Sequence, residues 1–457
     1  MSALAQTNAT RRRRRRRTRP AAARPAARTR TAGRAPVPKP FPVLDPWLWS
    51  QAGNSTRHAA ALRPFTRAEF GSDAAAPSEG HLQAANRLIG GLRAELLRVN
   101  GGVRGAAAQA RRQPTREQLE RLLVLKERAH QWVRGIEQIW DFYLELFGQR
   151  QSRYGELLLA ADRIGLDCYA AAFRGVGAHK TIPAPPPFCY MRTGFSPATF
   201  RRGIPLARIG RLPNPFPLVE LPFHRMVNPW TLGAILHEIS HNLQNDLGLD
   251  KLLPRAIERR LRAAGLPAEV ARTWARWNRE TFADLSGLLL GGPAIVASLM
   301  DVVGRSPRAT VHFSPGAPHP TPYLRTLISV ELLRRMGFAE QARRFERAWR
   351  RLYPDPGGGT IPRAMLQTFA QANPLVVDTI CFTPYQTLGG RSLAQVYRFE
   401  PKDQQMIEEA AARLAAGTDP GVVPARFLIG AARVALDRRF ARPGRLARNF
   451  YAELVRR

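Results

Sequence analysis

Cysteine is scarce in this chain. The 457 residues include three cysteines, Cys168, Cys189 and Cys381, which are widely spaced and form no CxxC pair. An odd number of such isolated cysteines implies no disulfide framework. We interpret them as small buried side chains in a reducing compartment, which predicts a cytoplasmic protein.

Long hydrophobic runs are missing as well. The best candidate for a membrane span is LSGLLLGGPAIVASLM, residues 285–300, which is shorter than the roughly 20 residues that a bilayer requires. Gly291, Gly292 and Pro293 also interrupt this stretch. We therefore predict no transmembrane segment and interpret residues 285–300 as part of a pair of buried core helices.

Lysines and acidic residues are few, whereas arginine is abundant. Only five of the 70 basic residues are lysines, the chain has 35 acidic residues, and its net charge is +35. Abundant Arg, Ala, Pro and Gly together are typical of a GC-rich genome, which would account for part of this bias. Whatever its origin, such a surface attracts polyanions in a salt-dependent way.

The N-terminal segment has no acidic residue at all. Residues 1–44 contain 13 basic residues, and like charges with prolines keep such a segment unfolded, so we predict a disordered Arg-rich arm. The arginines precede AAARPAARTRTAG rather than the apolar region of a secretory signal. Residues 11–34 are predicted to contact nucleic acid or another polyanion, and the alternative is a merely solvated tail.

One short stretch carries residues that suit chemistry. Residues 234–249, AILHEISHNLQNDLGL, place two histidines and a glutamate in an amphipathic helical run. His237 and His241 are four residues apart, so on a helix they share one face and can bind one metal ion. Glu238 is turned about 100° from His237, close enough to reach a water molecule on that metal. Because zinc lowers the pKa of such a water to about 7 and a carboxylate can take its proton, the trio indicates metal-assisted hydrolysis.

A metal site needs a third protein ligand, and two known patterns do not supply one. The metzincin pattern requires Gly at position 244 and His at position 247, where this chain has Gln244 and Leu247. Asp246 and Asp250 lie just downstream, but neither stands in a Gly-x-x-Asp context. A ligand must therefore come from farther along the chain.

The segment RETFADLSGLLL supplies a suitable pair of carboxylates. Glu280 and Asp284 are four residues apart and would share one face of a second helix. Glu280 would bind the metal, and Asp284 would form a hydrogen bond with a ligand histidine and fix its tautomer. The order HExxH followed by ExxxD resembles that of the gluzincin peptidases.

A third fragment narrows the resemblance. The ExxAD segment, which includes Ala283, is followed by HPTPYLR with His319, Pro320 and Arg325. This ExxAD and HPxxxxR order is similar to that of the CAAX-processing membrane endopeptidases and their bacterial heat-shock relatives. The resemblance covers residues 234–325 only. Since that family is built on transmembrane helices, we expect this chain to share its catalytic core and not its lipidated substrates.

The resemblance implies roles for individual residues. His237, His241 and Glu280 would hold Zn²⁺, and Glu238 would act as the catalytic base. The oxyanion formed from the peptide carbonyl needs a further hydrogen-bond donor, for which His319, Tyr323 and Arg325 are candidates. A structural role for His319 is the alternative.

The fold class that we predict is mainly α (α+β), with a helical zincin-like core and a small sheet. Proline-limited strands are expected in PFCYMRTG, PLARIGRL and PFPLVELPF, with PLVELPF as the edge strand that pairs with a substrate. The expected organisation begins with an arm (1–44), a linker (45–80) and a helical domain (81–180). A zincin-like catalytic domain (181–352) and a C-terminal helical region (353–457) follow.

Three functions remain open at this point. The leading one is a zinc-dependent endopeptidase, a hydrolase acting on a protein or peptide substrate. The second is a zincin-like fold that mainly binds nucleic acid or an acidic partner through its basic arm. The third is a structural helical protein in which the motif is accidental.

The arm yields the first testable prediction. Deleting residues 1–40 should weaken binding to duplex DNA or RNA and reduce its dependence on salt, because fewer phosphates are neutralised. For the full chain, affinity should fall about tenfold or more between 50 and 200 mM salt, measured by fluorescence anisotropy. Unchanged affinity and salt slope after truncation would show that the arm is a passive tail.

Overall fold

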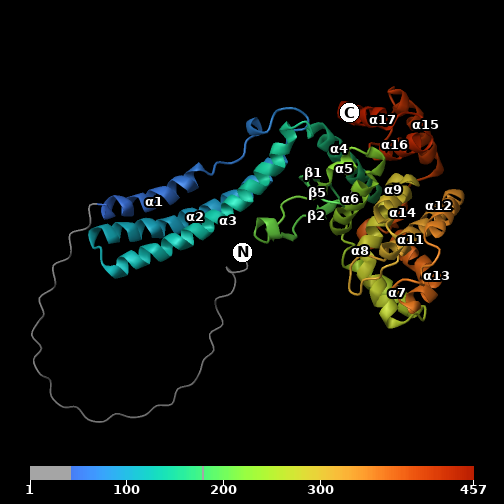
Figure 1. The fold of residues 1–457 in the computed structure, drawn as a ribbon, viewed down its shortest axis with the longest axis horizontal. Helices are drawn as coiled ribbons and strands as arrows, with labels where there is room; N and C mark the ends of the chain where they lie inside the picture. Colours follow the sequence, from blue (N-terminus) through green and yellow to red (C-terminus); the bar gives the residue numbers. More distant parts are fainter. Residues whose placement is uncertain (1–42, 178–179) are drawn as a thin grey trace, which may run out of the picture. The chain divides into compact units, whose positions relative to one another are not determined.

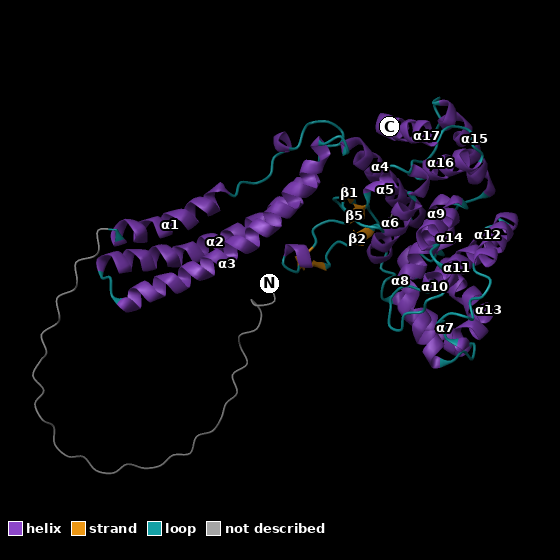
Figure 2. Cartoon of the chain, in the orientation of Figure 1, coloured by secondary structure: helices purple, strands orange, loops and turns teal. Residues whose placement is uncertain are grey.

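The computed structural model describes residues 43–177 and 180–457, and helix dominates these residues (Figure 2). Helix accounts for 69% of the described residues and strand for 4%, which confirms the prediction of a mainly helical protein with a small sheet. Residues 1–42 of the predicted arm lie outside the described residues. The chain forms two compact units, which are described separately.

The first unit is built from long helices. Its described residues are 43–64, 86–143 and 207–212. It holds helix α1 (Leu44–Ala61) and most of the helices α2 (Glu79–Arg112) and α3 (Arg116–Gly148). Residues 44–61 are therefore helical, which differs from the linker expected over 45–80. Pro46 does not prevent this helix, because it stands in the first turn, where a backbone N–H has no helical acceptor.

The core of the first unit is made of small and aliphatic side chains. Leu48 of α1 packs with Val99 and Val103 of α2 and with Leu122 of α3. The Asn100 side chain is buried among them and donates a hydrogen bond of 2.8 Å to the Ser55 carbonyl. Burial of this apolar side is what makes a helix of residues 44–61 stable.

The second unit comprises residues 65–85, 144–206 and 213–457, without the undescribed 178–179. Its helices, labelled in Figure 1 except for α10, are α4 (Gly155–Val176), α5 (Phe223–Met226), α6 (Gly233–Asp246), α7 (Leu252–Ala263), α8 (Ala268–Gly291), α9 (Ala294–Val303), α10 (Pro307–Thr310), α11 (Pro322–Arg335), α12 (Ala339–Leu352), α13 (Arg363–Val377), α14 (Leu393–Tyr397), α15 (Pro401–Ala416), α16 (Phe427–Asp437) and α17 (Pro443–Arg456). Buried side chains from α4 to α17 form one hydrophobic cluster, which extends from Leu158 to Leu454.

A three-stranded sheet belongs to this unit, with the order β1-β5-β2. Its strands are β1 (Phe188–Met191), β2 (Ala198–Phe200) and β5 (Leu218–Leu221); two-residue strands are β3 (Pro205–Leu206) and β4 (Leu212–Pro213). β5 runs parallel to β1, with Phe188 opposite Leu218, and antiparallel to β2, with Thr199 opposite Val219. The prediction that PLVELPF is the edge strand is therefore wrong. β5 is central and nearly fully buried, and β2 is the edge strand on the side away from β1.

The stretch 285–300 forms the expected pair of buried helices. It covers the end of α8 and most of α9, and Gly291, Gly292 and Pro293 make the break between them. Among the described residues, no helix is long and apolar enough to cross a membrane. This result agrees with the sequence prediction of no transmembrane segment.

Gly292 allows α8 to end beneath an aromatic ring. Its φ of 75° and ψ of −166° lie in a region that only glycine adopts readily. A Cβ at this position would also come within 2.2 Å of the Phe399 ring. The end of α8, and with it the start of α9, therefore requires glycine for two independent reasons.

These two reasons can be separated by a matched pair of variants. Gly177 ends α4 with φ 95° and ψ −172°, nearly the same conformation, but a Cβ added there would meet no atom within 4 Å. Gly292→Ala should destabilise the protein by about 1–3 kcal/mol more than Gly177→Ala, because only the former adds overpacking to backbone strain. Urea unfolding measures the free energy of unfolding of both variants. Equal losses of this free energy would contradict the close approach of Phe399 to Gly292.

Candidate metal centre

The orientation of α6 is set by its apolar side. The following side chains of this helix have no exposed area: Ile235, Leu236, Ile239 and Leu243. With these residues in the core, His237 and His241 face the neighbouring helix α8. Gly233 starts α6 so close to α9 that an added Cβ would lie 2.6 Å from the Ser298 Cβ. Small residues thus let the histidine-bearing helix enter the centre of the unit.

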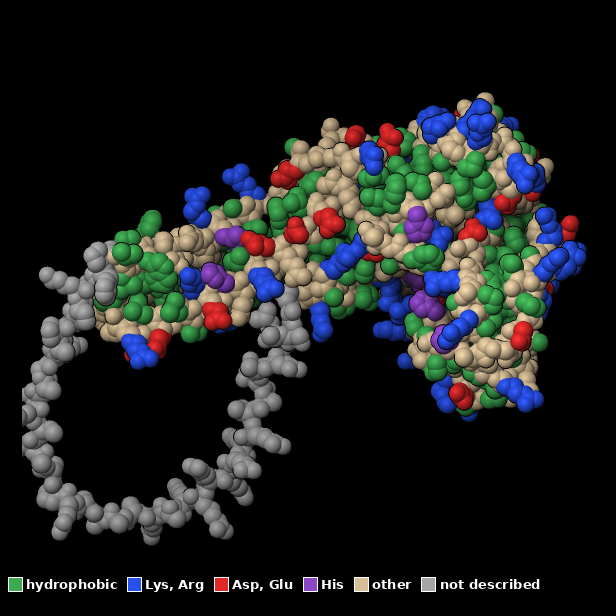
Figure 3. Space-filling view, in the orientation of Figure 1, with side chains coloured by type: hydrophobic (Ala, Val, Ile, Leu, Met, Phe, Trp, Pro, Cys, Tyr) green, Lys and Arg blue, Asp and Glu red, His purple; other side chains and the backbone are tan. Residues whose placement is uncertain are grey.

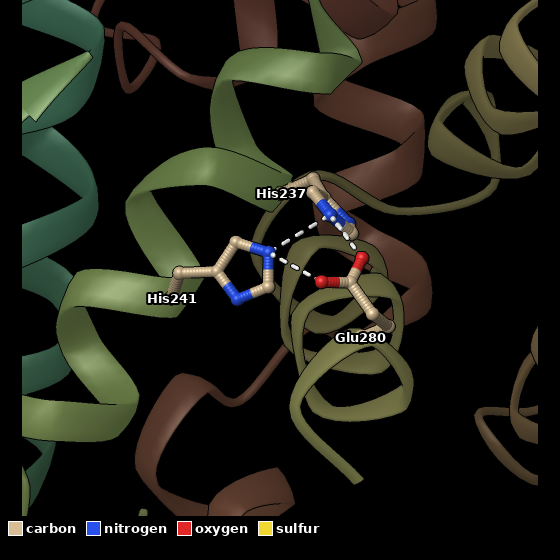
Figure 4. A group of neighbouring side chains, drawn as sticks. All are labelled: His237, His241 and Glu280. Carbon is tan, nitrogen blue, oxygen red and sulfur yellow. Dashed lines mark hydrogen bonds and ion pairs between the residues drawn. The ribbon is translucent and has the colours of Figure 1, made fainter. Parts of the chain in front are cut away.

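Three side chains from α6 and α8 converge on one point (Figure 4). The Nε2 atoms of His237 and His241 are 3.1 Å apart. They lie 3.4 Å and 3.5 Å from the two carboxylate oxygens of Glu280, Oε2 and Oε1 respectively. The structure therefore brings together the three side chains that were predicted to bind a metal.

These distances suit a tetrahedral metal ion. The edge of a tetrahedron is about 1.6 times the distance from its centre to a corner, so N and O ligands at about 2.0–2.1 Å from zinc are roughly 3.3–3.4 Å apart. The separation of 3.1 Å between the two nitrogens is close to this value, and each nitrogen lies 3.4 or 3.5 Å from a different oxygen of Glu280. One ligand atom from each of the three residues lies within 4.8 Å of the other two. Two imidazoles and a carboxylate also form the protein ligand set of one class of catalytic zinc site. The three residues could therefore hold a metal ion.

Asp284 fixes the tautomer of His237. Its Oδ1 lies 2.8 Å from Nδ1 of His237, so that Nε2 is directed at the cluster. The same carboxylate accepts two hydrogen bonds from Arg325, from Nε to Oδ2 at 2.8 Å and from Nη2 to Oδ1 at 2.7 Å. The Asp284 side chain is only 3% exposed, so this bidentate pair compensates for a buried negative charge.

The charges of the cluster act strongly on one another. Burial opposes a charge on His237, but Asp284 and Glu280 outweigh it and raise the pKa of His237 to about 10. Burial lowers the pKa of His241 to about 3, and the charge of His237 acts in the same direction. Burial also works to raise the pKa of Glu280, yet His237 and His241 hold that pKa well below its usual range. The carboxylates thus favour a positive charge on His237.

Glu238 faces a cavity of about 800 Å³. The side chains of the cluster and Glu238 line this cavity together with β2 and parts of α8 and α9. Among the described residues, the Glu238 carboxylate makes no hydrogen bond or ion pair, and burial raises its pKa to about 7. In the space-filling view, histidine side chains lie in and beside a hollow of this unit, with basic side chains around them (Figure 3). A carboxylate without a partner therefore stands beside the three ligand atoms and is open to the cavity.

The three predicted oxyanion donors are placed differently. His319 lines the cavity with a side chain that is 58% exposed, and its Nε2 is 3.2 Å from Glu280 Oε2. Arg325 also lines the cavity, but its guanidinium is held by Asp284. Tyr323 is buried, its hydroxyl contacts Arg350, and it is not part of the cavity wall. The geometry favours His319 over the other two as a donor to a bound substrate.

Asn242 was missed by the sequence analysis. Its Nδ2 donates a hydrogen bond of 2.6 Å to Thr199 Oγ1, and the Thr199 hydroxyl donates one of 3.0 Å to the Leu218 carbonyl. Asn242 therefore connects helix α6 to the edge strand β2. Its place directly after His241 was the available signal, but the sequence does not show that residue 199 lies opposite.

No protein-family profile, curated protein or solved structure matches this chain. The gluzincin resemblance therefore stays a prediction, carried by the HExxH, ExxAD and HPxxxxR fragments and by the way in which they meet in space.

Removal of one ligand tests the metal centre. The purified chain should contain close to one zinc ion. Loss of a residue that only hydrogen-bonds to a metal ligand typically lowers metal affinity by roughly 10–100-fold. His241→Ala removes a ligand itself and should lower zinc affinity by more than this. Metal analysis after dialysis measures the effect. His312→Ala is the control, because His312 lines the same cavity outside the cluster. Equal zinc contents in the two variants would place the site elsewhere.

Proposed function

We propose that the chain is a metal-dependent endopeptidase whose metal is zinc. The observation that carries this proposal is the convergence of His237, His241 and Glu280, which each offer one ligand atom within 4.8 Å of the others. It is supported by the position of Glu238, which lies next in sequence to His237 and opens to the same cavity.

His237, His241 and Glu280 would hold the zinc. When bound, zinc supplies a Lewis acid that makes water more acidic and polarises a carbonyl group. Asp284 keeps the His237 Nε2 lone pair directed at the metal position, and Arg325 keeps Asp284 in place. These two outer residues position the cluster and do not touch the substrate.

Glu238 is the general base of this proposal. Its carboxylate accepts a proton from the attacking water and later passes that proton to the leaving amine. The reaction needs a carboxylate that is free to exchange a proton, and Glu238 has no competing partner among the described residues. His319 Nε2, at the exposed side of the cluster, donates to the oxygen of the tetrahedral intermediate.

The edge strand β2 suits an extended peptide. Its pairing partner β5 occupies one side, and residues 198–200 line the cavity. A peptide that adds to β2 by main-chain hydrogen bonds would pass the metal centre. The reason is that Asn242, the residue after His241, is hydrogen-bonded to Thr199 of β2. An edge strand that lines the cavity supports a peptide substrate over a compact small molecule.

The second candidate function remains binding of nucleic acid or an acidic partner through residues 11–34. It is favoured by the 13 basic and no acidic residues of the segment 1–44. This function does not compete with hydrolysis, since the arm and the metal cluster are separate parts of the sequence.

Replacing the base separates hydrolysis from binding. Glu238→Gln should retain one zinc per chain but cleave casein about 10²–10⁴-fold more slowly, the usual contribution of a general base. Glu269→Gln, at an exposed acid in the first turn of α8, is the control for the loss of one charge. Equal cleavage by parent and Glu238→Gln would exclude this residue as base, and an inactive zinc-loaded parent would favour the binding function.

A further inference from the structure

The cavity wall has an uneven distribution of charge. Its acidic residues are Glu238, Glu280 and Asp284, all in or beside the metal cluster. Elsewhere on the wall the charged residues are Arg201, Arg279 and Arg305, with no Asp or Glu among the described lining residues. Beyond the cluster, the cavity is therefore positively charged.

Arg201 and Arg279 lie close to the metal centre. Arg201 directly follows the last residue of the edge strand β2, and Arg279 directly precedes Glu280 on α8. Burial lowers the pKa of Arg201, and the charge of Arg279 lowers it further, while Asp250 acts in the opposite direction. Both arginines line the same cavity.

Neither arginine forms an ion pair with a carboxylate in the described part of the chain. Many arginines of this unit do, as shown by Arg335 with Glu331 at 2.9 Å and Arg426 with Asp167 at 2.8 Å. Two cations that line one cavity without an ion-pair partner leave hydrogen-bond donors and charge that an anion can satisfy. Guanidinium groups match a carboxylate with two parallel hydrogen bonds.

We propose that Arg201 and Arg279 form a subsite for a carboxylate group of the peptide substrate, next to the bond that is cleaved. This inference rests on the proposed peptidase function and names its substrate class. The carboxylate comes from an Asp or Glu side chain or from the free C-terminus of the peptide, and the experiment below distinguishes these sources.

The rest of the wall favours a peptide over a nucleic acid. Apolar side chains of α8 and α9 line it, namely Leu288, Ile295, Val296, Leu299 and Val302. Single-stranded nucleic acids are held by aromatic rings on which bases stack, and Phe200 is the one Phe, Tyr or Trp among the described lining residues. A cavity lined by apolar side chains and by arginines suits a peptide with both apolar and acidic residues.

The test uses the zinc-loaded full chain carrying Glu238→Gln, so that binding is measured without cleavage. The probes are fluorescent decapeptides that differ in one Glu or Gln, each with a free or an amidated C-terminus. We expect the Glu peptide, or the free-acid peptide, to bind about tenfold more tightly than its neutral counterpart, as charged hydrogen bonds usually provide. The pair that shows the difference identifies the source of the carboxylate.

Three further substitutions locate the subsite. Arg201→Gln and Arg279→Gln should each remove most of the preference and leave affinity for the neutral peptide nearly unchanged. Arg201→Lys should restore part of it, because it keeps the charge and loses the paired donors. Arg343→Gln is the control, since Arg343 is exposed on α12 and is not part of the cavity wall.

Several outcomes would overturn the subsite. Equal binding of acidic and neutral peptides by the parent, or a preference that survives in both glutamine variants, would do so. Displacement of the peptide by a single-stranded oligonucleotide, lost in the same variants, would assign the arginines to nucleic acid. Failure of the peptidase proposal is seen separately, because the zinc-loaded chain with Glu238 intact would then bind the acidic peptides and not cleave them.

Discussion

The buried carboxylate of Asp284 is the constraint on which the candidate site depends. A carboxylate that is 3% exposed must be compensated, and the structure does this with Arg325 from α11 and His237 from α6. One side chain of α8 thereby fixes the positions of two other helices. Glu280, one turn earlier on α8, faces His237 as well, together with His241. The arrangement of three ligand atoms follows from satisfying one buried charge.

The sequence was sufficient to predict the cluster because its residues lie in two pairs with helical spacing. His237 with His241, and Glu280 with Asp284, needed only the helix period, and the structure places all four together. Residues whose role depends on a contact between a strand and a helix could not be predicted from the helix period. Asn242, Thr199 and Arg201 depend on how β2 lies against α6, and no local pattern encodes that contact.

The overall fold shows the same division. Helical periodicity and the glycine-proline break predicted the buried α8–α9 pair, since these signals are local. Strand order was not predictable, because β5 differs from an edge strand only through its partners on both sides. Helix α1 was missed since its stability comes from packing by Leu48 and Ala59 and not from a strong pattern of its own.

The positions of these side chains around the axes of α6 and α8 limit where residues can be inserted into this sequence. One residue inserted between Glu280 and Asp284 would turn Asp284 by about 100° around the axis of α8, away from both His237 and Arg325. An insertion between His237 and His241 would separate the imidazoles in the same way. Helix α7 contributes no ligand, so added residues in the turns before and after it would leave both pairs in phase. Length variation should therefore be tolerated between the two motifs and forbidden within them.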